Sequence, residues 1–228
     1  CIGCGSYSGA NTGIESPFKN GMRRGFVSDK IEIIELELPY SNNSSFISRI
    51  NVFIRYAFSC VWLALQADYD LIFATSTPLT VAIPGIFARW FRRKVFIFEV
   101  RDLWPELPRA MGIIKNPIII GLSSLLESCS YKSAHHIVAL SPGIRDGILE
   151  KGISKKKISL VPNGCDLDIF SCPTEGWRPQ GINNNDFMAL YAGTHGIANG
   201  LDSVLSAAKE LKRRGRDDIK IVLVGEGQ

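Results

Sequence analysis

The sequence predicts an α/β fold built on a mostly parallel, Rossmann-like sheet. Short apolar segments alternate along the chain with longer segments of helical periodicity, which is the pattern of repeated strand–helix units. The segment KVFIFEV at 94–100 is a nearly continuous apolar run, as is typical of a strand buried on both faces. Ser141 and Pro142 then supply an N-cap and a first-turn proline, and Lys151-Gly152 supplies a stop signal. These two observations predict one strand and one helix of the repeating unit.

The other elements follow the same reasoning in chain order. Apolar runs predict strands at 31–38, 70–74, 94–100, 135–140 and 157–161, and helical periodicity predicts helices at 46–67, 79–93, 117–132 and 142–150. The strand–helix pattern restarts with a strand at 187–192, a helix at 201–214 and a strand at 219–224. One face of the helix at 201–214 carries only apolar residues, namely Leu201, Val204, Leu205, Ala208 and Leu211.

A change of composition separates the two series of elements. The stretch 171–185 contains Pro173, Gly176, Pro179 and Gly181, followed by three consecutive Asn, which is typical of an interdomain linker. We therefore expect a first domain at 1–170, a linker at 171–186 and the beginning of a second domain at 187–228. The chain opens at Cys1 and stops at Gln228 directly after an apolar run, so we expect it to be part of a longer protein.

Composition excludes several classes of protein. With 46% hydrophobic and 21% charged residues among 228, the chain is neither disordered nor collagen-like nor a coiled coil. A net charge of +4 is too small to indicate nucleic-acid binding by itself, and six Cys are too few for a disulfide scaffold. We find no signal peptide and no membrane-spanning segment, because Pro78 and Pro84-Gly85 interrupt the longest uncharged run. A cytoplasmic location is the resulting expectation.

The segment Phe46–Ala67 has an unusual composition. Only Asn51, Arg55 and Ser59 form a thin polar stripe, and nearly all other positions are apolar. Such a helix is either buried between other elements or partly inserted into a membrane face. Burial is the expectation, although four basic residues keep the second interpretation open, namely Arg23, Arg24, Arg49 and Arg55.

Candidate site residues of the first domain follow from a topological rule, since ligands of open parallel sheets bind beyond the carboxyl ends of the strands. This rule selects the loops 75–78, 101–106, 140–142 and 161–164. Asp102 follows a buried strand, so it can orient a substrate hydroxyl or accept a proton; the alternative is a turn carboxylate paired with Arg101. Trp104 is either a stacking platform for a sugar ring or an anchor in the core.

The corresponding loops of the second domain are 193–200 and 225–227. Three glycines in the first of them allow the backbone to approach a phosphate closely, and a helix begins immediately afterwards. His195 can donate a hydrogen bond to a phosphate oxygen. The alternative is that Asn199 is only an N-cap, with Asp202 as its partner.

Together the loop segments resemble a known family. KVFIFEVRDLWPE at 94–106, HHIVALSPG at 135–143 and VPNGCDLDIF at 161–170 are similar in content, order and spacing to family 4 glycosyltransferases with the GT-B fold. YAGTHGIANGLDSVLSAAKEL at 191–211 and IVLVGEGQ at 221–228 resemble the opening of that family's second domain. The most similar subgroup is bacterial transferases that build O-antigen or capsular sugars on a lipid carrier.

The resemblance implies two facing Rossmann-like domains, the first for the acceptor and the second for the nucleotide-sugar. It implies a retaining hexosyltransferase that moves a sugar to a hydroxyl of a lipid-linked or saccharide acceptor in cell-surface (lipopolysaccharide or other polysaccharide) biosynthesis. Neither a metal nor another cofactor is implied, nucleic acid is not a partner, and the location is cytoplasmic, with peripheral contact at the inner face of the membrane. The implied roles are catalysis by Asp102, acceptor binding by Ser76, Thr77, Arg101, Trp104, Glu106 and Asn163, and nucleotide-sugar binding by Gly193, Thr194, His195, Asn199, Gly200, Gly225 and Glu226.

The chain also departs from the family pattern. Many members carry an Arg and a Lys in the loop after the second domain's first strand, where Thr194 or His195, and Asn199, stand here. Many place a His where this chain has Asp102. The family's first strand and its paired Glu motif would lie before Cys1 and beyond Gln228, so we expect the 228-residue chain alone to be inactive. A GT-B nucleotide-sugar epimerase and a non-catalytic partner subunit remain as alternatives.

Overall fold

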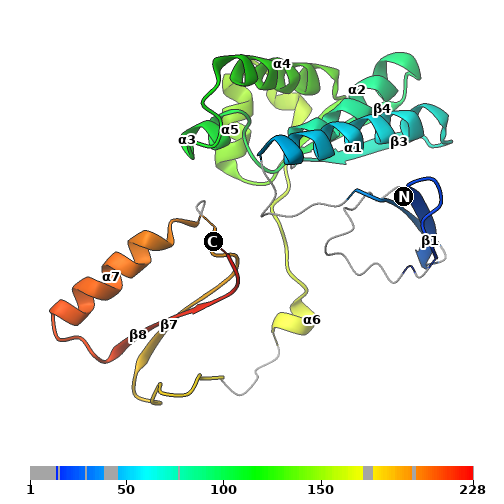
Figure 1. Cartoon of the computed structure of the whole chain (residues 1–228). Coiled ribbons are helices and arrows are strands. Elements are labelled where there is room, and N and C mark those ends of the chain that lie inside the picture. Colours follow the sequence, from blue (N-terminus) through cyan, green and yellow to red (C-terminus); the bar gives the residue numbers. More distant parts are fainter. Residues whose placement is uncertain are drawn as a thin grey trace. The chain divides into compact units, whose positions relative to one another are not determined.

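The computed structural model of the chain describes residues 14, 16–28, 30–38, 46–76, 78–171, 177–196 and 199–227. The chain divides into two compact units (Figure 1). The first comprises Cys1–Ala110 and Ile114–Asn163, and the second comprises Met111–Ile113 and Gly164–Gln228. The domain and linker boundaries expected from the sequence, at 170 and 186, stay a prediction.

A parallel sheet of four strands forms the centre of the first unit. Its strands are β3 (Leu71–Thr75), β4 (Val95–Val100), β5 (His136–Ala139) and β6 (Ile158–Leu160), and they lie side by side in chain order. All three neighbouring pairs are parallel. The predicted α/β fold with a parallel sheet is therefore confirmed.

The first unit contains helices of very different length. They are α1 (Phe46–Gln66), η1 (Leu79–Val81), α2 (Ala82–Phe91), α3 (Glu106–Ala110), α4 (Pro117–Ser133), α5 (Pro142–Glu150) and η2 (Lys155–Lys157). The side chain of Asn116 accepts a hydrogen bond from the N–H of Ile118 at the start of α4, and Ser141 accepts one from Ile144 at the start of α5. A proline stands in the first turn of both helices.

One face of the sheet carries the core. Phe98 is aligned with Ile137, and Val100 with Ala139, and all four side chains are almost completely buried. Tyr131 of α4 and Ile148 of α5 belong to the same apolar cluster. Helix α2 approaches this face closely, because a Cβ at Gly85 would lie only 2.2 Å from the ring of Phe96. Burial of these apolar side chains is the main favourable contribution to the stability of this unit.

Helix α1 packs on α2 (Figure 1) but is buried on one side only. Ala57, Val61 and Ala64 are buried, whereas the opposite side of the helix exposes Phe58 and Trp62. The expectation that the whole segment is buried is therefore wrong for its outer face. Among the residues that the structure describes, no helix is long and apolar enough to cross a membrane.

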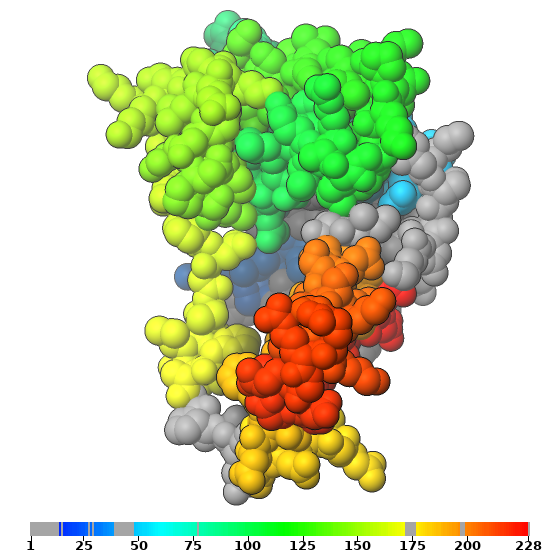
Figure 2. All heavy atoms as spheres, turned by 90° about the vertical axis from the view of Figure 1, so that its left-hand side faces the viewer, coloured from blue at the N-terminus to red at the C-terminus, as the bar shows by residue number. Residues whose placement is uncertain are grey.

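Helix α4, which belongs to the green part of Figure 2, also has an exposed apolar side. Ile118, Leu122 and Leu125 are 70%, 62% and 61% exposed, and they recur at the spacing of one helical face. The apolar composition of the predicted helix therefore serves the core on one side only.

The predicted strand at 31–38 is shorter and lies outside the parallel sheet. Strand β2 (Ile31–Leu36) pairs with β1 (Met22–Ser28), a strand that is not among the predicted elements, in a separate antiparallel sheet. Arg23 of β1 and the buried Glu35 of β2 form an ion pair across this hairpin. Cross-strand pairing within a hairpin, rather than a strand–helix crossover, therefore fixes this segment.

The second unit contains α6 (Leu167–Phe170), β7 (Phe187–Ala192), α7 (Leu201–Arg213) and β8 (Ile219–Val224). Strands β7 and β8 are parallel over their full length, as the restarted strand–helix pattern predicts. The short helices α3 and α6 are not among the predicted elements. Among the described residues of this unit, none is buried, so its two-stranded sheet has no core comparable to that of the first unit.

Candidate functional site

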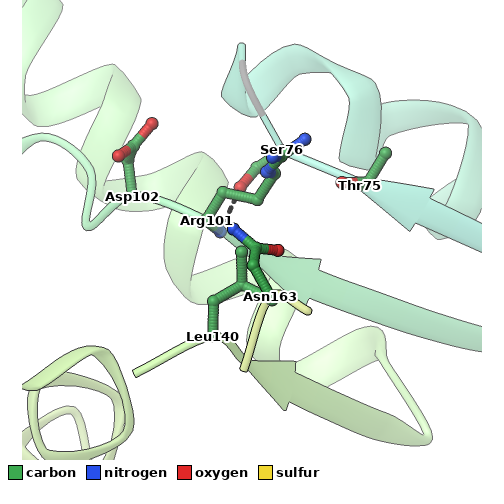
Figure 3. Close-up of a pocket in the computed structure, with 6 residues that line it drawn as sticks. All are labelled: Thr75, Ser76, Arg101, Asp102, Leu140 and Asn163. Carbon is green, nitrogen blue, oxygen red and sulfur yellow. Dashed lines mark hydrogen bonds between the residues drawn. The ribbon is translucent and has the colours of Figure 1, made fainter. Parts of the chain in front are cut away.

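A polar pocket lies where the four parallel strands of the first unit end. Its volume is about 450 Å³, and it is lined by Thr75, Ser76, Arg101, Asp102, Leu140 and Asn163 (Figure 3). Thr75 is the last residue of β3, Arg101 follows β4, Leu140 follows β5, and Asn163 stands just beyond β6. The structure therefore brings together residues from all four loops that the strand-end rule selects.

Ser76 is the most tightly held of these residues. It is 1% exposed, and its N–H donates to the carbonyl of Glu99 at 3.0 Å. Its Oγ accepts a hydrogen bond from the N–H of Arg101 at 2.9 Å, drawn as a dashed line in Figure 3. A serine hydroxyl has one hydrogen to donate besides its acceptor positions, so Ser76 can still donate into the pocket. These bonds also fix the loop after β3 against the loop after β4.

Arg101, Asn163 and Asp102 give the pocket donors and acceptors of different kinds. Arg101 supplies a permanent positive charge and Asn163 an amide, and Figure 3 shows both side chains beside Ser76. The carboxylate of Asp102 points away from this group in the same view. A neutral ligand with several hydroxyl groups matches such a mixture of charge and hydrogen-bonding capacity.

Two predicted acceptor residues have other surroundings, and a third lies outside the described residues. Trp104 packs against the apolar core cluster, which supports the interpretation of a core anchor, and it does not line the pocket. Glu106 forms an ion pair with Lys151 at 2.5 Å and does not line it either. Thr77, the third of these predicted acceptor residues, lies outside the described part of the chain. Thr75 and Leu140 line the pocket but were not selected individually, although both stand at predicted strand ends.

The loops after β7 and β8 lie side by side in the second unit. The N–H of Gly193 donates to the carbonyl of Val224, and the N–H of His195 donates to the carbonyl of Glu226, both at 2.9 Å. A Cβ at Gly225 would lie 1.8 Å from the carbonyl oxygen of Gly193. Glycine is required there because the two backbones approach each other. The N–H groups of Gly193 and His195 are therefore already used within the protein.

Asn199 does not cap helix α7, so the N-cap interpretation is wrong. The N-cap is Gly200, with φ 59° and no side-chain cap. The side chain of Asn199 instead donates to the carbonyl of Thr194 at 2.5 Å, and the hydroxyl of Tyr191 donates to the same oxygen at 2.9 Å. Two side chains thus fix Thr194 within its loop.

The imidazole of His195 carries a buried nitrogen in these loops. Its Nε2 is buried and has no hydrogen-bond partner within the described part of the chain. A buried nitrogen without a partner is costly, so a ligand that hydrogen-bonds to it would be favoured. The structure thus places Gly193, Thr194, His195, Gly225 and Glu226 together, with Nε2 of His195 buried beside Gly225.

Comparisons with known proteins agree with this architecture. Residues 14–164 match the family model of the glycosyl transferase 4-like domain. Over 166 residues the chain is 20% identical to an uncharacterized glycosyltransferase of Methanocaldococcus jannaschii. This aligned stretch covers 72% of this chain and 42% of that protein.

Two solved structures show the same fold. The HepE protein of Anabaena in complex with UDP and glucose matches with a TM-score of 0.54 at 13% identity, over 86% of this chain and 48% of that one. A putative UDP-N-acetylglucosamine 2-epimerase from Listeria monocytogenes matches with a TM-score of 0.52 at 13% identity, over 84% and 47%. The chain spans less than half the length of each of these relatives. Because the family model matches well over half of this chain, the chain belongs to the glycosyl transferase 4-like family, as the resemblance predicts.

Proposed function

We propose that the full-length protein transfers a sugar from a nucleotide-sugar to an acceptor hydroxyl. The observation that carries this proposal is the pocket in which Ser76, Arg101, Asp102 and Asn163 meet at the ends of the parallel strands. Its volume of about 450 Å³ falls in the range typical of small-molecule sites. In a chain of the glycosyl transferase 4-like family, such a pocket suits a sugar acceptor.

In the proposed reaction, the acceptor hydroxyl forms a bond to the anomeric carbon as the bond to the nucleoside diphosphate breaks. Asp102 accepts the hydrogen bond of the acceptor hydroxyl and orients it, while the other polar side chains of the pocket hold the rest of the acceptor. As the hydroxyl oxygen becomes bonded to the anomeric carbon, its proton passes to the carboxylate of Asp102. We propose that the anomeric configuration is retained, that the sugar is a hexose, and that no metal takes part.

The loops of the second unit take the donor in this proposal. The unpaired Nε2 of His195 donates to an oxygen of the leaving diphosphate, and Gly193, Thr194, Asn199, Gly200, Gly225 and Glu226 shape the surrounding surface. A donor aimed at the position where negative charge develops stabilises the transition state more than the ground state. HepE is a relative with UDP bound, which supports a nucleotide-sugar as the donor class.

The proposed acceptor is lipid-linked or a saccharide, in the synthesis of a cell-surface polysaccharide. The similarity to the O-antigen and capsule subgroup supports this choice. The protein would act in the cytoplasm, with peripheral contact at the inner face of the membrane.

Substitution of the pocket carboxylate tests the proposal. In the full-length enzyme, Asp102→Asn should lower turnover about 100-fold or more, which is the usual scale for a positioned proton-transfer group. Asp146→Asn is the matched control, because Asp146 is an exposed carboxylate of α5 that does not line the pocket. Release of nucleoside diphosphate and labelled product are both measured. Unchanged turnover of a folded Asp102→Asn protein would reduce Asp102 to a turn residue.

The similarity to the Listeria epimerase makes one further function testable in the same assay. An epimerase converts the nucleotide-sugar without any acceptor, whereas a transferase releases nucleoside diphosphate in proportion to the acceptor consumed. Epimerised nucleotide-sugar formed in the absence of acceptor would replace the proposed function.

A further inference from the structure

The outer side of α1 exposes a stripe of large apolar side chains. Ile54, Phe58, Trp62 and Leu65 are 44%, 69%, 53% and 36% exposed, and their spacing of four, four and three residues places them on one helical face. Exposure of several large apolar groups in one row is unusual on a surface that faces only water. The stripe therefore indicates a binding surface.

A basic and aromatic segment lies beside the end of this stripe. Residues 89–94 read RWFRRK, and Trp90 and Phe91 are 66% and 73% exposed. This segment ends α2 and leads into β4, so it lies at the start of the strands, whereas the candidate acceptor pocket lies at their ends.

Hydrogen bonds and cation–π contacts join the segment to α1 and the residues that follow it. The guanidinium of Arg92 donates to the carbonyl of Ala67 at 2.5 Å and to that of Ala64 at 3.4 Å. Both Arg92 and Lys94 also lie over the ring of Tyr69, which follows α1. The carboxyl-terminal ends of α1 and α2 therefore meet, so the basic segment lies beside the end of the helix that carries the apolar stripe. We name the stripe and the segment together the α1–α2 corner.

Further cations extend the positive charge of this corner. Trp90 donates to the hydroxyl of Ser133 at 3.0 Å, at the end of α4, and Lys157 donates to the carbonyl of Tyr131 nearby at 2.7 Å. The pKa of His135 is lowered, first by partial burial and then by the charges of Arg89 and Lys157. Asp68 and Asp70 are the exposed acidic residues between α1 and β3, and they offset part of this charge.

We infer that the α1–α2 corner docks the protein on a membrane surface that contains anionic phospholipids. Cations near such a surface each contribute about 1 kcal/mol of attraction, and exposed Trp and Phe side chains insert at the boundary of headgroups and acyl chains. The apolar stripe of α1 matches a helix lying in the plane of the interface. Charge complementarity and apolar burial thus favour the same partner. The inference rests on the proposed function for its purpose, since a lipid-linked acceptor is carried in such a membrane.

The apolar stripe distinguishes this partner from nucleic acid. Arg with Trp and Phe also suits a nucleic acid, which binds by phosphate contacts and stacking. However, a polyanion in water leaves Ile54, Phe58, Trp62 and Leu65 exposed, whereas a lipid surface covers them. A bilayer therefore accounts for both halves of the corner.

Vesicle co-sedimentation of the 228-residue chain, without any sugar, tests the inference. Vesicles of phosphatidylcholine with phosphatidylglycerol should bind the chain at least 10-fold more tightly than phosphatidylcholine alone, and added salt should weaken binding. Arg93 of the basic segment and Lys156, the neighbour of Lys157, are both exposed. Arg93→Gln with Lys156→Gln should weaken binding to the anionic vesicles about 10- to 30-fold. Phe58→Ser with Trp62→Ser should weaken it about 10-fold or more.

Matched controls come from exposed residues elsewhere in the chain. Ile118→Ser with Leu122→Ser removes an equally exposed apolar pair from α4, and Lys209→Gln with Lys212→Gln removes two exposed charges from α7. Neither should change vesicle binding more than twofold. Because all these side chains are exposed, each variant should keep the circular dichroism spectrum of the parent.

Three outcomes would overturn the inference. Equal binding to neutral and anionic vesicles would remove the electrostatic argument, and equal loss in the α4 control would remove the specificity of the corner. Displacement of the chain from vesicles by duplex DNA at equal phosphate concentration, with the Phe58 and Trp62 variant unaffected, would identify a nucleic-acid surface instead. Since no sugar is present, failure of sugar transfer by the full-length protein leaves these results unchanged.

Discussion

The pair of Glu127 and Lys151 offers the sharpest test of the energetics of the first unit. The carboxylate of Glu127 has a side-chain exposure of 2%, accepts from the hydroxyl of Tyr131 at 3.1 Å, and lies 3.0 Å from the ammonium of Lys151. Lys151, at the end of α5, also pairs with Glu106 of α3 at 2.5 Å. One ammonium therefore ties together α3, α4 and α5.

The perturbation is Lys151→Met, which keeps the apolar stem and removes the charge. Breaking a fully buried ion pair costs about 3–5 kcal/mol, because a buried charge is left uncompensated. The side chain of Lys151 is 37% exposed, so water screens the interaction and the cost falls to about 2–3 kcal/mol. Lys156→Met, at an exposed position, should change the free energy of unfolding by less than about 0.5 kcal/mol.

The stability lost in Lys151→Met should depend on pH, because Glu127 can take up a proton. Burial raises the pKa of the Glu127 carboxyl, and Lys151 counteracts this shift through its hydrogen bond and charge. Without Lys151 the pKa of Glu127 rises further, so the folded protein takes up a proton more readily than the unfolded chain. Stability gained in this way is present at low pH and lost as pH rises through the folded pKa. The destabilisation should therefore be largest near neutral pH and smaller at about pH 5.

Urea unfolding at the two pH values, followed by circular dichroism, measures the effect. Glu127→Gln in the Lys151→Met background should restore about half or more of the lost stability, because no buried charge remains. An equal loss at both pH values, or no recovery in the double variant, would refute the account of an uncompensated buried carboxylate.

Three further predictions concern other parts of the chain. Gly85→Ala should destabilise the first unit by about 1–3 kcal/mol in urea unfolding, because its Cβ would lie 2.2 Å from Phe96. Gly121→Ala is the control and should be tolerated, because a Cβ at Gly121 would have no atom within 4 Å. Similar losses of stability in both variants would contradict the close packing of α2. His195→Ala in the full-length protein should weaken nucleoside diphosphate binding by about 1.5–3 kcal/mol in calorimetry, and equal affinity would make His195 a bystander. In hydrogen exchange, the amides of β4 and β5 should be protected longest, and those of β7 and β8 should exchange far sooner. The reason is that a two-stranded sheet without buried residues opens locally. Equal protection of the two sheets would contradict this reasoning, because it would require a core in the second unit.

Local signals account for the elements that the sequence predicts well. The strand expected at 94–100 is β4 (Val95–Val100), and the helix expected after Ser141 is α5, because an apolar run and an N-cap act through residues only a few positions apart. The strand at 31–38 was expected within the strand–helix series, yet it pairs in a hairpin. Its apolar and acidic alternation is the same in either partnership, so only the partner strand decides between them.

In the candidate site, too, the sequence predicts some features and tertiary contacts decide the others. The strand-end rule selected Ser76, Arg101, Asp102 and Asn163, and they meet in one pocket because parallel strands end at the same edge of a sheet. Trp104 and Glu106 share a loop with Asp102, but one packs on the core and the other pairs with Lys151. A loop can direct neighbouring side chains to opposite sides, and sequence order does not reveal which one reaches the pocket.

The sequence by itself therefore determined the family, the α/β class, the parallel sheet and the edge at which the pocket lies. These follow from periodicity, caps and motif order, which are properties of neighbouring residues along the chain. Only the tertiary structure decided that Asn199 binds Thr194 instead of capping α7, that Glu127 shares Lys151 with Glu106, and that α1 leaves one apolar side uncovered. Each depends on contacts between segments far apart in the sequence or on the choice among several local hydrogen bonds, and packing in three dimensions settles both.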